Sequence, residues 1–314
     1  MQVGLIITVL LVLLFIAGWI FFRYTMTREG LAMPGKPRIT EEHPDLRAWA
    51  MYRARHEADV QWFEKQAMEE VWITSHDGLK LYGQYLHCDR PERLVICVHG
   101  YRGAAKHDFA SQGRWLHEEG CDVLFITQRA SGNSEGNYTT FGAKEKLDVR
   151  DWARFAAETH PDLPICLYGI SMGASTVLLS SVTGLPEAVK GFIADCGFIS
   201  VRSILAAQSR QAFHLPPVPL LDILQIYCIL LAKFRFSDAD ARRVLPDNTI
   251  PTLFIHGEDD HFVWPQNTKE NYAACGGPKE LLLIPHGVHA SSFCENTGLY
   301  QAYVRKLFRG EIRL

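Results

Sequence analysis

From residue 70 onward, short apolar runs alternate with longer amphipathic segments. The apolar runs predict eight strands, at residues 71–74, 79–86, 93–98, 122–127, 163–168, 188–194, 249–255 and 280–284; the segments between them predict helices at 107–119, 145–159 and 297–308. Apolar strands separated by helices indicate a mostly parallel sheet covered on both faces. The Asp77-Gly78 pair is a hairpin signal, so the first two strands should form an antiparallel edge.

The N-terminus carries a different pattern, an uncharged apolar run over residues 4–22. About 19 residues at ~1.5 Å each match the roughly 30 Å hydrocarbon core of a bilayer. A secretory signal peptide would need basic residues before this run and a cleavage site after it. Neither is present, since the run continues directly into Arg23. We therefore expect a single uncleaved transmembrane helix.

Flanking charge predicts the orientation of this helix. Arg23, Arg28, Lys36 and Arg38 follow the span, and nothing comparable precedes it. The positive-inside rule then places the C-terminal body in the cytoplasm. The cysteines are scattered without metal-ligand spacing, and several lie in apolar runs, which also favours a reducing compartment.

Overall composition narrows the possible functions. The chain is 47% hydrophobic and 21% charged, as in ordinary globular proteins, and its net charge of −3 argues against a nucleic-acid surface. It contains no clustered metal ligands and no glycine-rich phosphate loop. We therefore expect neither a metal nor an organic cofactor.

Three regions follow from these patterns: a transmembrane anchor at 1–23, a linker and N-terminal helix at 24–69, and a catalytic domain at 70–314. Residues 30–45 are rich in proline and glycine, and 45–66 predict a helix whose aromatic residues should dock it onto the main domain. Residues 197–248 interrupt the strand–helix alternation and predict a cap over the pocket. Its apolar stretch, 220–234, is interpreted first as a buried cap helix; a lining for acyl chains and a second contact with the bilayer are alternatives.

The clearest chemical motif is Gly-x-Ser-x-Gly at residues 169–173, between a predicted strand and a predicted helix. In this setting the motif is typical of a nucleophile elbow, in which a strained turn presents the serine hydroxyl above the sheet. Ser171 is the predicted nucleophile. The following helix N-terminus would direct free N–H groups at developing negative charge.

A serine nucleophile needs a base and an orienting acid. In proteins with a nucleophile elbow, these two residues come after the serine in the sequence and lie at strand ends. The strand ending near residue 255 leads into a loop with several acidic residues, and the strand ending at 284 leads into a loop containing His289. His289 is the predicted base. The turn at 99–103 should supply an oxyanion hole from the backbone N–H groups of Tyr101 and Met172. We interpret His99 as a structural histidine.

Five motifs together resemble one family: His-Gly-Tyr-x-Gly at 99–103, Gln-Arg-Ala-x-Gly-x-Ser-Glu-Gly at 128–136, Gly-x-Ser-x-Gly at 169–173, His-Gly-x-x-Asp-x-x-Val at 256–263 and Gly-x-His-Ala at 287–290. They are similar to the serine α/β-hydrolases of the membrane-anchored BEM46-like and serine-aminopeptidase-like type. The resemblance covers roughly residues 70–310. It implies that Asp260 is the acid, with Asp259 and Asp195 as alternatives. Thr127 and Ser131 stand where the family commonly has Asp and His, which puts the geometry of that loop in doubt.

The resulting prediction is a membrane-tethered serine hydrolase of the carboxylesterase or lipase type, acting on acyl or lipid-derived esters through an acyl-enzyme. A serine aminopeptidase is one alternative, with Glu258 or Asp259 binding the substrate amine. A binding protein that keeps the fold without catalysis is another. His286 and His261 are interpreted as loop-surface residues, and His256 receives no role.

Overall fold

A computed structural model describes residues 2–30 and 44–313 of the chain. An eight-stranded sheet forms its centre, in the order β1-β2-β4-β3-β5-β6-β7-β8. The strands are β1 Glu69–Thr74, β2 Lys80–Leu86, β3 Arg93–Val98, β4 Cys121–Ile126, β5 Ile165–Ile170, β6 Val189–Asp195, β7 Thr252–Gly257 and β8 Lys279–Ile284. β1 pairs with β2, and β2 with β4, in antiparallel fashion. All the other neighbouring pairs, from β4–β3 to β7–β8, are parallel. The predicted fold class and antiparallel edge are confirmed.

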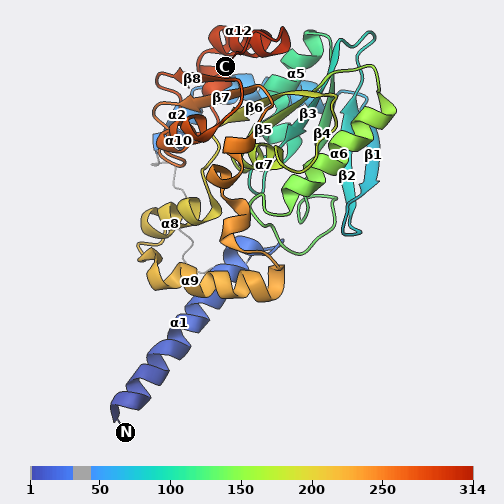
Figure 1. The fold of residues 1–314 in the computed structure, drawn as a ribbon. Coiled ribbons are helices and arrows are strands. Elements are labelled where there is room, and N and C mark those ends of the chain that lie inside the picture. The colour runs from blue at the N-terminus through green and yellow to red at the C-terminus, as the bar shows by residue number, and fades with distance from the viewer. Residues whose placement is uncertain (1, 31–43, 314) are drawn as a thin grey trace.

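Helices cover both faces of the sheet (Figure 1). Alternate residues of β3 point to opposite faces: Val95 and Cys97 pack with one core, Leu94 and Ile96 with the other. The first core includes α3 Arg53–Glu64, α5 Ala110–Glu118 and α12 Thr297–Phe308; the second includes α6 Glu145–Thr159 and α7 Met172–Ser180. α10 Gln266–Ala274 packs beside α7 on β7.

Two predicted helices are each split in two. Residues 45–66 form α2 Pro44–Trp49 and α3, and residues 107–119 form α4 Ala105–Asp108 and α5. At the second break Phe109 leaves helical geometry with φ −126° and is fully buried against Tyr168. The break therefore places a large side chain in the core. Aromatic docking of the N-terminal helix is as predicted, since Phe63 of α3 packs edge-on against Phe125 of β4.

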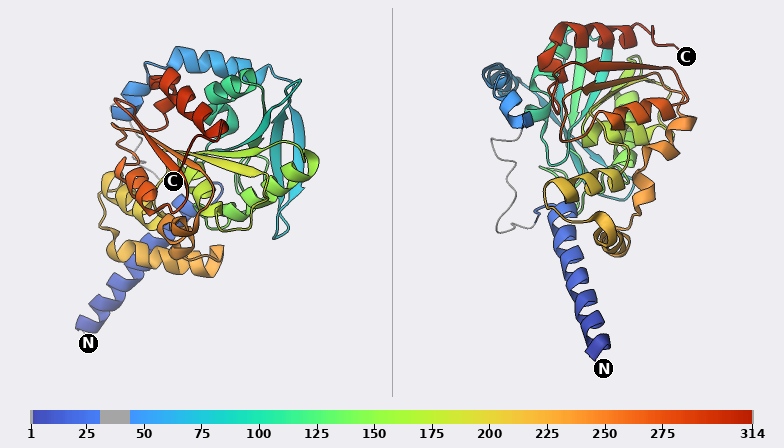
Figure 2. Two further views of the ribbon diagram at one scale, coloured as in Figure 1. Left: turned by 45° about the horizontal axis from the view of Figure 1, so that its top comes forward. Right: turned by 90° about the vertical axis from the view of Figure 1, so that its left-hand side faces the viewer.

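The predicted cap lies between β6 and β7. It consists of α8 Val201–Gln211, α9 Pro217–Tyr227, a π-helical turn η1 Cys228–Ala232, and three short 3-10 turns. Ser200 begins α8 by accepting a hydrogen bond from the Ser203 N–H, which satisfies one of the free donors of the first turn. The cap sits at the end of the molecule from which α1 projects (Figure 2).

α1 runs from Gln2 to Met26 and contains the candidate membrane span, Gly4–Met26, which is long and apolar enough to cross a bilayer. Its N-terminal part extends away from the body, whereas its last residues enter it (Figures 1 and 2). Phe21, Phe22 and Met26 are buried in one apolar cluster with residues of the cap. The predicted linker at 30–45 lies almost entirely outside the described residues.

Candidate active site

Ser171 occupies a sharp turn between β5 and α7. Its backbone has φ 55° and ψ −119°, a strained conformation for a residue with a side chain. The backbone is held by the Ser171 N–H, which donates to the Asp195 carbonyl at 2.9 Å, and by the Ser171 carbonyl, which accepts from Ser175 N–H. Strain of this kind is the expected geometry of a nucleophile elbow.

The two motif glycines are required by close backbone packing. A Cβ on Gly173 would lie 1.8 Å from the carbonyl oxygen of Val98 in β3. A Cβ on Gly169 would lie 2.3 Å from the carbonyl carbon of Gly173. No side chain fits at either position, so the strand and the helix can approach closely only with glycine there.

His289 and Asp260 form a hydrogen-bonded chain with Ser171. The Ser171 Oγ lies 3.0 Å from His289 Nε2, and His289 Nδ1 lies 2.7 Å from Asp260 Oδ2. The other carboxylate oxygen, Oδ1, accepts the N–H groups of Phe262 and Val263 at 2.9 and 2.7 Å. The ionised carboxylate thus fixes the imidazole with Nδ1–H donating, which leaves Nε2 free to accept the serine proton.

The loops that carry the acid and the base meet at a pair of glycines. A Cβ on Gly257 would lie 2.2 Å from the carbonyl oxygen of Gly287. The Asp259 N–H donates to the same carbonyl at 2.9 Å. Because the two backbones touch here, the loop after β7 brings Asp260 to within hydrogen-bonding distance of His289 in the loop after β8.

Asp260 and His289 shift each other's pKa in opposite directions. Burial opposes ionisation of Asp260, but the charge of His289 and hydrogen bonds from His256 and His289 hold the pKa of Asp260 below its ordinary value. Burial would likewise lower the pKa of His289, yet the Asp260 carboxylate raises it well above 6.5. The pair is therefore built to stabilise an imidazolium cation, which is what a general base becomes after accepting a proton.

His256, to which sequence reasoning assigned no role, supports the acid from behind. Its Nε2 lies 3.0 Å from Asp260 Oδ2 and 2.7 Å from the Val263 carbonyl, and its Nδ1 lies 2.6 Å from Thr268 Oγ1. Two acceptors face Nε2, so that nitrogen carries the proton and Nδ1 accepts from the threonine. Only its position in the His-Gly-x-x-Asp motif hinted at this contact.

The two alternative acids, Asp195 and Asp259, have partners other than His289. Asp195 is fully buried and accepts hydrogen bonds from Tyr300 Oη at 2.9 Å and Ser292 Oγ at 3.3 Å. Burial raises the pKa of Asp195 to about 6. Asp259 is exposed and lies 3.5 Å from His286 Nδ1. His286 is a surface residue, as predicted. His261 Nδ1, also on an exposed side chain, contacts Asp45 Oδ1 at 3.1 Å.

The predicted oxyanion donors flank the nucleophile. Gly100, which precedes Tyr101, would place a Cβ 3.4 Å from Ser171 Cβ. Met172 is the first residue of α7, so its N–H has no carbonyl one turn earlier in the helix to bond. Among the described residues, neither the Tyr101 N–H nor the Met172 N–H donates a hydrogen bond. His99 is structural, as predicted: its Nδ1 lies 2.7 Å from the Gly100 carbonyl and its Nε2 accepts from Gln128 N–H at 3.0 Å.

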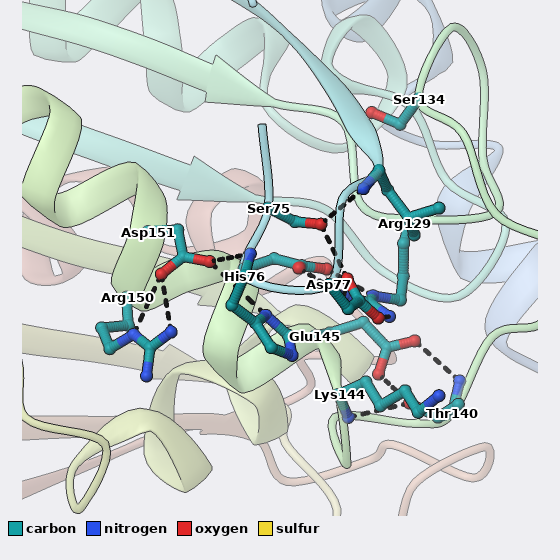
Figure 3. A network of polar contacts seen from close by, with 12 residues as sticks. Ser75, His76, Asp77, Arg129, Ser134, Thr140, Lys144, Glu145, Arg150 and Asp151 are labelled. Atoms are coloured by element: carbon teal, nitrogen blue, oxygen red, sulfur yellow. Dashed lines mark hydrogen bonds and ion pairs between the residues drawn. The ribbon is translucent and has the colours of Figure 1, made fainter. Parts of the chain in front are cut away.

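The loop at 127–136, in which Thr127 and Ser131 depart from the family pattern, is held by an ion-pair network around the buried Arg129. Arg129 reaches Asp77 of the β1–β2 turn, as Figure 3 shows, and also binds Asp148 of α6 at 2.6 Å. Ser134 Oγ donates to the Thr127 carbonyl at 2.6 Å and accepts from Tyr82 N–H. These contacts fix the loop without the two usual side chains.

Two distant segments that the sequence did not connect with the site also contact it. The indole N–H of Trp49 in α2 donates to the carbonyl of His289 at 2.8 Å. The hydroxyl of Tyr101 donates to the carbonyl of Thr25 in α1 at 2.9 Å. The guanidinium of Arg102 donates to the carbonyls of Tyr24 and Thr27. A cation is favourable at these carbonyls because they form the negative end of the helix dipole.

Two groups of side chains have the composition of a metal site. Cys196, Asp260 and His289 place donor atoms within 4.8 Å of one another, as do His76, Asp77 and Asp148. Asp77 and Asp148 already bind the cation of Arg129. In the first group burial raises the pKa of the Cys196 thiol to about 11, so the sulfur is a neutral thiol behind the imidazole.

Known proteins resemble this chain over most of its length. A sequence profile described as serine aminopeptidase, S33, matches residues 89–229. The uncharacterized protein YqkD of Bacillus subtilis (strain 168) is 30% identical over 248 residues, which are 78% of this chain and 80% of YqkD. An uncharacterized membrane protein of Saccharomyces cerevisiae, YNL320W, is 21% identical over 79% of this chain and 82% of its own length. The Pyrococcus furiosus esterase Pf2001 superposes with a TM-score of 0.63 at 24% identity, covering 80% of this chain and 92% of the esterase.

Proposed function

The chain belongs to the S33 serine aminopeptidase family of α/β-hydrolases, and within that family we propose that it is a membrane-anchored serine hydrolase that cleaves carboxylic esters. The observation that carries the proposal is the chain of hydrogen bonds from Ser171 Oγ through His289 to Asp260. A strained serine, an imidazole with a free Nε2 and a buried carboxylate together meet the requirements of nucleophilic acyl transfer.

In the proposed mechanism Ser171 Oγ attacks the ester carbonyl carbon while His289 Nε2 accepts its proton. The oxyanion of the tetrahedral intermediate binds the N–H groups of Tyr101 and Met172, each such donor contributing about 2.7–4 kcal/mol. The C–O bond then breaks, and the leaving alkoxide takes the proton from His289. Water repeats the sequence on the acyl-enzyme, so the products are a carboxylic acid and an alcohol.

Apolar surroundings favour an acyl or lipid-like substrate. Met172, next to the nucleophile, packs in the same cluster as Phe141, Phe198 and Val263 and the buried end of α1. The ring of Phe262 lies 4.9 Å from the imidazole of His289. Phe262 is partly exposed while the cluster around Met172 is buried, so an acyl chain can replace water against the Phe262 ring, whereas a charged substrate would lose hydration beside this apolar cluster.

A fluorophosphonate probe tests the nucleophile. We expect the full chain in detergent to be labelled covalently and Ser171→Ala to show no labelling, because the probe reacts only with an activated serine. Ser181→Ala is the matched control: this serine follows the other end of α7, and its hydroxyl has no hydrogen-bond partner among the described residues. Labelling that persists in Ser171→Ala would show that another residue is the nucleophile.

Aminopeptidase activity is the second candidate, because the family profile carries that name. An amine-binding pocket would need an acidic side chain, but Glu258 and Asp259 are exposed and Asp259 faces His286. We therefore expect p-nitrophenyl acyl esters to be hydrolysed with a higher kcat/KM than aminoacyl p-nitroanilides. The reverse order would favour the peptidase, and turnover of neither alongside intact probe labelling would point to a different leaving group. A protein that neither turns over substrate nor reacts with the probe would be the silent binding protein.

We further propose that α1 spans the bilayer and that the catalytic body lies on the cytoplasmic side. The helix is long and apolar enough to cross a membrane, Arg23 lies in its last turn and Arg28 follows it. Protease treatment of sealed microsomes tests the orientation: the body should be degraded without permeabilisation if it is cytoplasmic. Protection until detergent is added would reverse the assignment.

A further inference from the structure

The cap carries apolar side chains that no described part of the chain covers. Val218 and Leu230 are 61% and 58% exposed. Leu215, Ile226 and Leu231 are exposed as well. On the opposite side of the same segment Leu220, Leu221, Leu224 and Cys228 are buried in the body. The segment α9–η1 is therefore apolar on both sides, although burial within the protein accounts for only one.

This exposed surface is continuous with α1. α9 lies across α1 where that helix enters the body (Figure 1). The hydroxyl of Tyr227 donates to the Phe15 carbonyl at 3.1 Å, and its ring packs 5.5 Å from that of Trp19. A Cβ on Gly18 would lie 2.4 Å from Ile223 Cγ2, so the two helices touch closely there. α9 is thus fixed to α1 at the level of residues 15–22.

The candidate span sets where that level must lie. It covers Gly4–Met26 and therefore includes residues 15–22, where α1 contacts α9. When α1 crosses the bilayer along this span, the portion in contact with α9 also lies at membrane depth.

Charge around the surface is arranged for a headgroup layer. Asp222 is the acidic residue on the exposed side of α9, and it is paired with Arg202 at 2.9 Å. Lys233 and Arg235, which follow η1, are exposed. Arg23 lies over the Trp19 ring near the C-terminal end of α1. Apolar side chains bordered by cations are the pattern of a segment lying in the membrane interface.

We propose that the exposed face of α9–η1 is a second membrane-contact surface, seated in the interfacial layer of the same bilayer that α1 spans. The catalytic body is then docked on the membrane through its cap. This inference rests on the anchor part of the proposed function and not on its chemistry. A second copy of the chain is the less favoured occupant, because the surface adjoins a helix whose own surroundings are lipid.

Quenching by brominated lipid tests the proposal. The full chain is reconstituted into vesicles of phosphatidylcholine with a minority of phosphatidylglycerol, with or without phosphatidylcholine brominated on the acyl chain. Leu230→Trp places a fluorophore on the face, and Ile226→Trp is the substitute if the first variant does not fold. Leu299→Trp is the matched control, because Leu299 is also exposed and its helix, α12, lies at the opposite end of the molecule from α9 (Figure 1).

We expect the emission added by Leu230→Trp to be lost in brominated vesicles, and the emission added by Leu299→Trp to be retained. Retention of both, in protein that floats with the vesicles, would overturn the docked surface while leaving the anchor intact. Protein that fails to float would instead contradict the anchor. Retention together with a dimer in analytical ultracentrifugation would assign the surface to a second copy.

Discussion

At the scale of single residues, the unusual feature is the sharing of one buried carboxylate by two histidines. Asp260 Oδ2 lies 3.0 Å from His256 and 2.7 Å from His289. Only His289 reaches Ser171, while His256 is fixed from its other nitrogen by Thr268. His256 therefore holds the carboxylate in place and does not compete for the serine proton.

The pH dependence of catalysis should report the Asp260–His289 pair. His289 must be neutral to accept a proton, and its pKa is raised above 6.5, so kcat/KM should rise with pH through a midpoint above 6.5. Asp260→Asn removes the negative charge that raises the pKa of His289, while burial still lowers that pKa. The midpoint of the profile should therefore move to lower pH. We also expect kcat/KM of this variant to fall by about 10³- to 10⁴-fold.

Asp195→Asn is the control for that measurement. Burial raises the pKa of this carboxyl to about 6, so the neutral amide resembles the form that predominates below pH 6. The profile of Asp195→Asn should keep its midpoint. If Asp195→Asn, and not Asp260→Asn, moves the midpoint and lowers kcat/KM, the acid is Asp195.

The sequence predicted part of this residue set. Ser171 and His289 follow from local motifs, chain order and strand ends, whereas Asp260 is preferred to Asp259 and Asp195 only through the family resemblance. Trp49 contacts the His289 loop across 240 positions of sequence, and no local pattern signals that contact. His256 lies inside a recognised motif, but its bond to Asp260 depends on how the loop folds back.

At the scale of elements, strand positions followed from composition, whereas helix ends did not. Each predicted strand is present within a few residues, because the central strands are apolar on both faces and fit the middle of a sheet, whereas β1 is largely exposed and fits its edge. The helices at 45–66 and 107–119 are interrupted because Trp49, Tyr52 and Phe109 contact the body. Tertiary contacts override helix propensity at such points.

Gly173→Ala tests the contact between β3 and α7. The added Cβ would lie 1.8 Å from the Val98 carbonyl oxygen, so the backbone must move. We expect the variant to be destabilised by about 3 kcal/mol or more, as in other cases of severe overpacking, with loss of probe labelling. Thermal unfolding in detergent measures this.

Gly298→Ala is the matched substitution, because the same methyl group in the first turn of α12 has no atom within 4 Å. Removing a glycine from a helix should leave stability unchanged or raise it by about 0.5–1 kcal/mol. Equal destabilisation of the two variants would show that the close approach at Gly173 is not the cause.

At the scale of the whole molecule, α1 is a candidate membrane span at one end and part of the packed body at the other. Apolar side chains suit both lipid and a protein core. The sequence therefore could not show that α1 becomes buried in the body after residue 17. The structure places Phe21, Phe22 and Met26 in the cap cluster. The predicted boundary between anchor and body, after residue 23, remains a prediction.

Two truncated proteins test this dual role. A fragment of residues 18–314 keeps the buried end of α1, whereas a fragment of residues 27–314 removes it. Each large apolar side chain lost from a buried position costs about 1.5–3 kcal/mol, so we expect the shorter fragment to unfold at lower temperature and to bind a hydrophobic dye. Equal unfolding temperatures and equal dye binding would show that α1 is only a tether.

The hydrogen bond from Tyr101 to Thr25 links α1 to the turn beside the nucleophile. If α1 spans the bilayer as proposed, one continuous helix runs from lipid to that turn, and Ser171 then sits at a set height above the headgroups. The Ser171 hydroxyl could then attack only ester bonds that lie near that height, whatever the intrinsic reactivity of the substrate. A thicker or thinner bilayer would change the tilt of the helix and, with it, which bonds fall within reach.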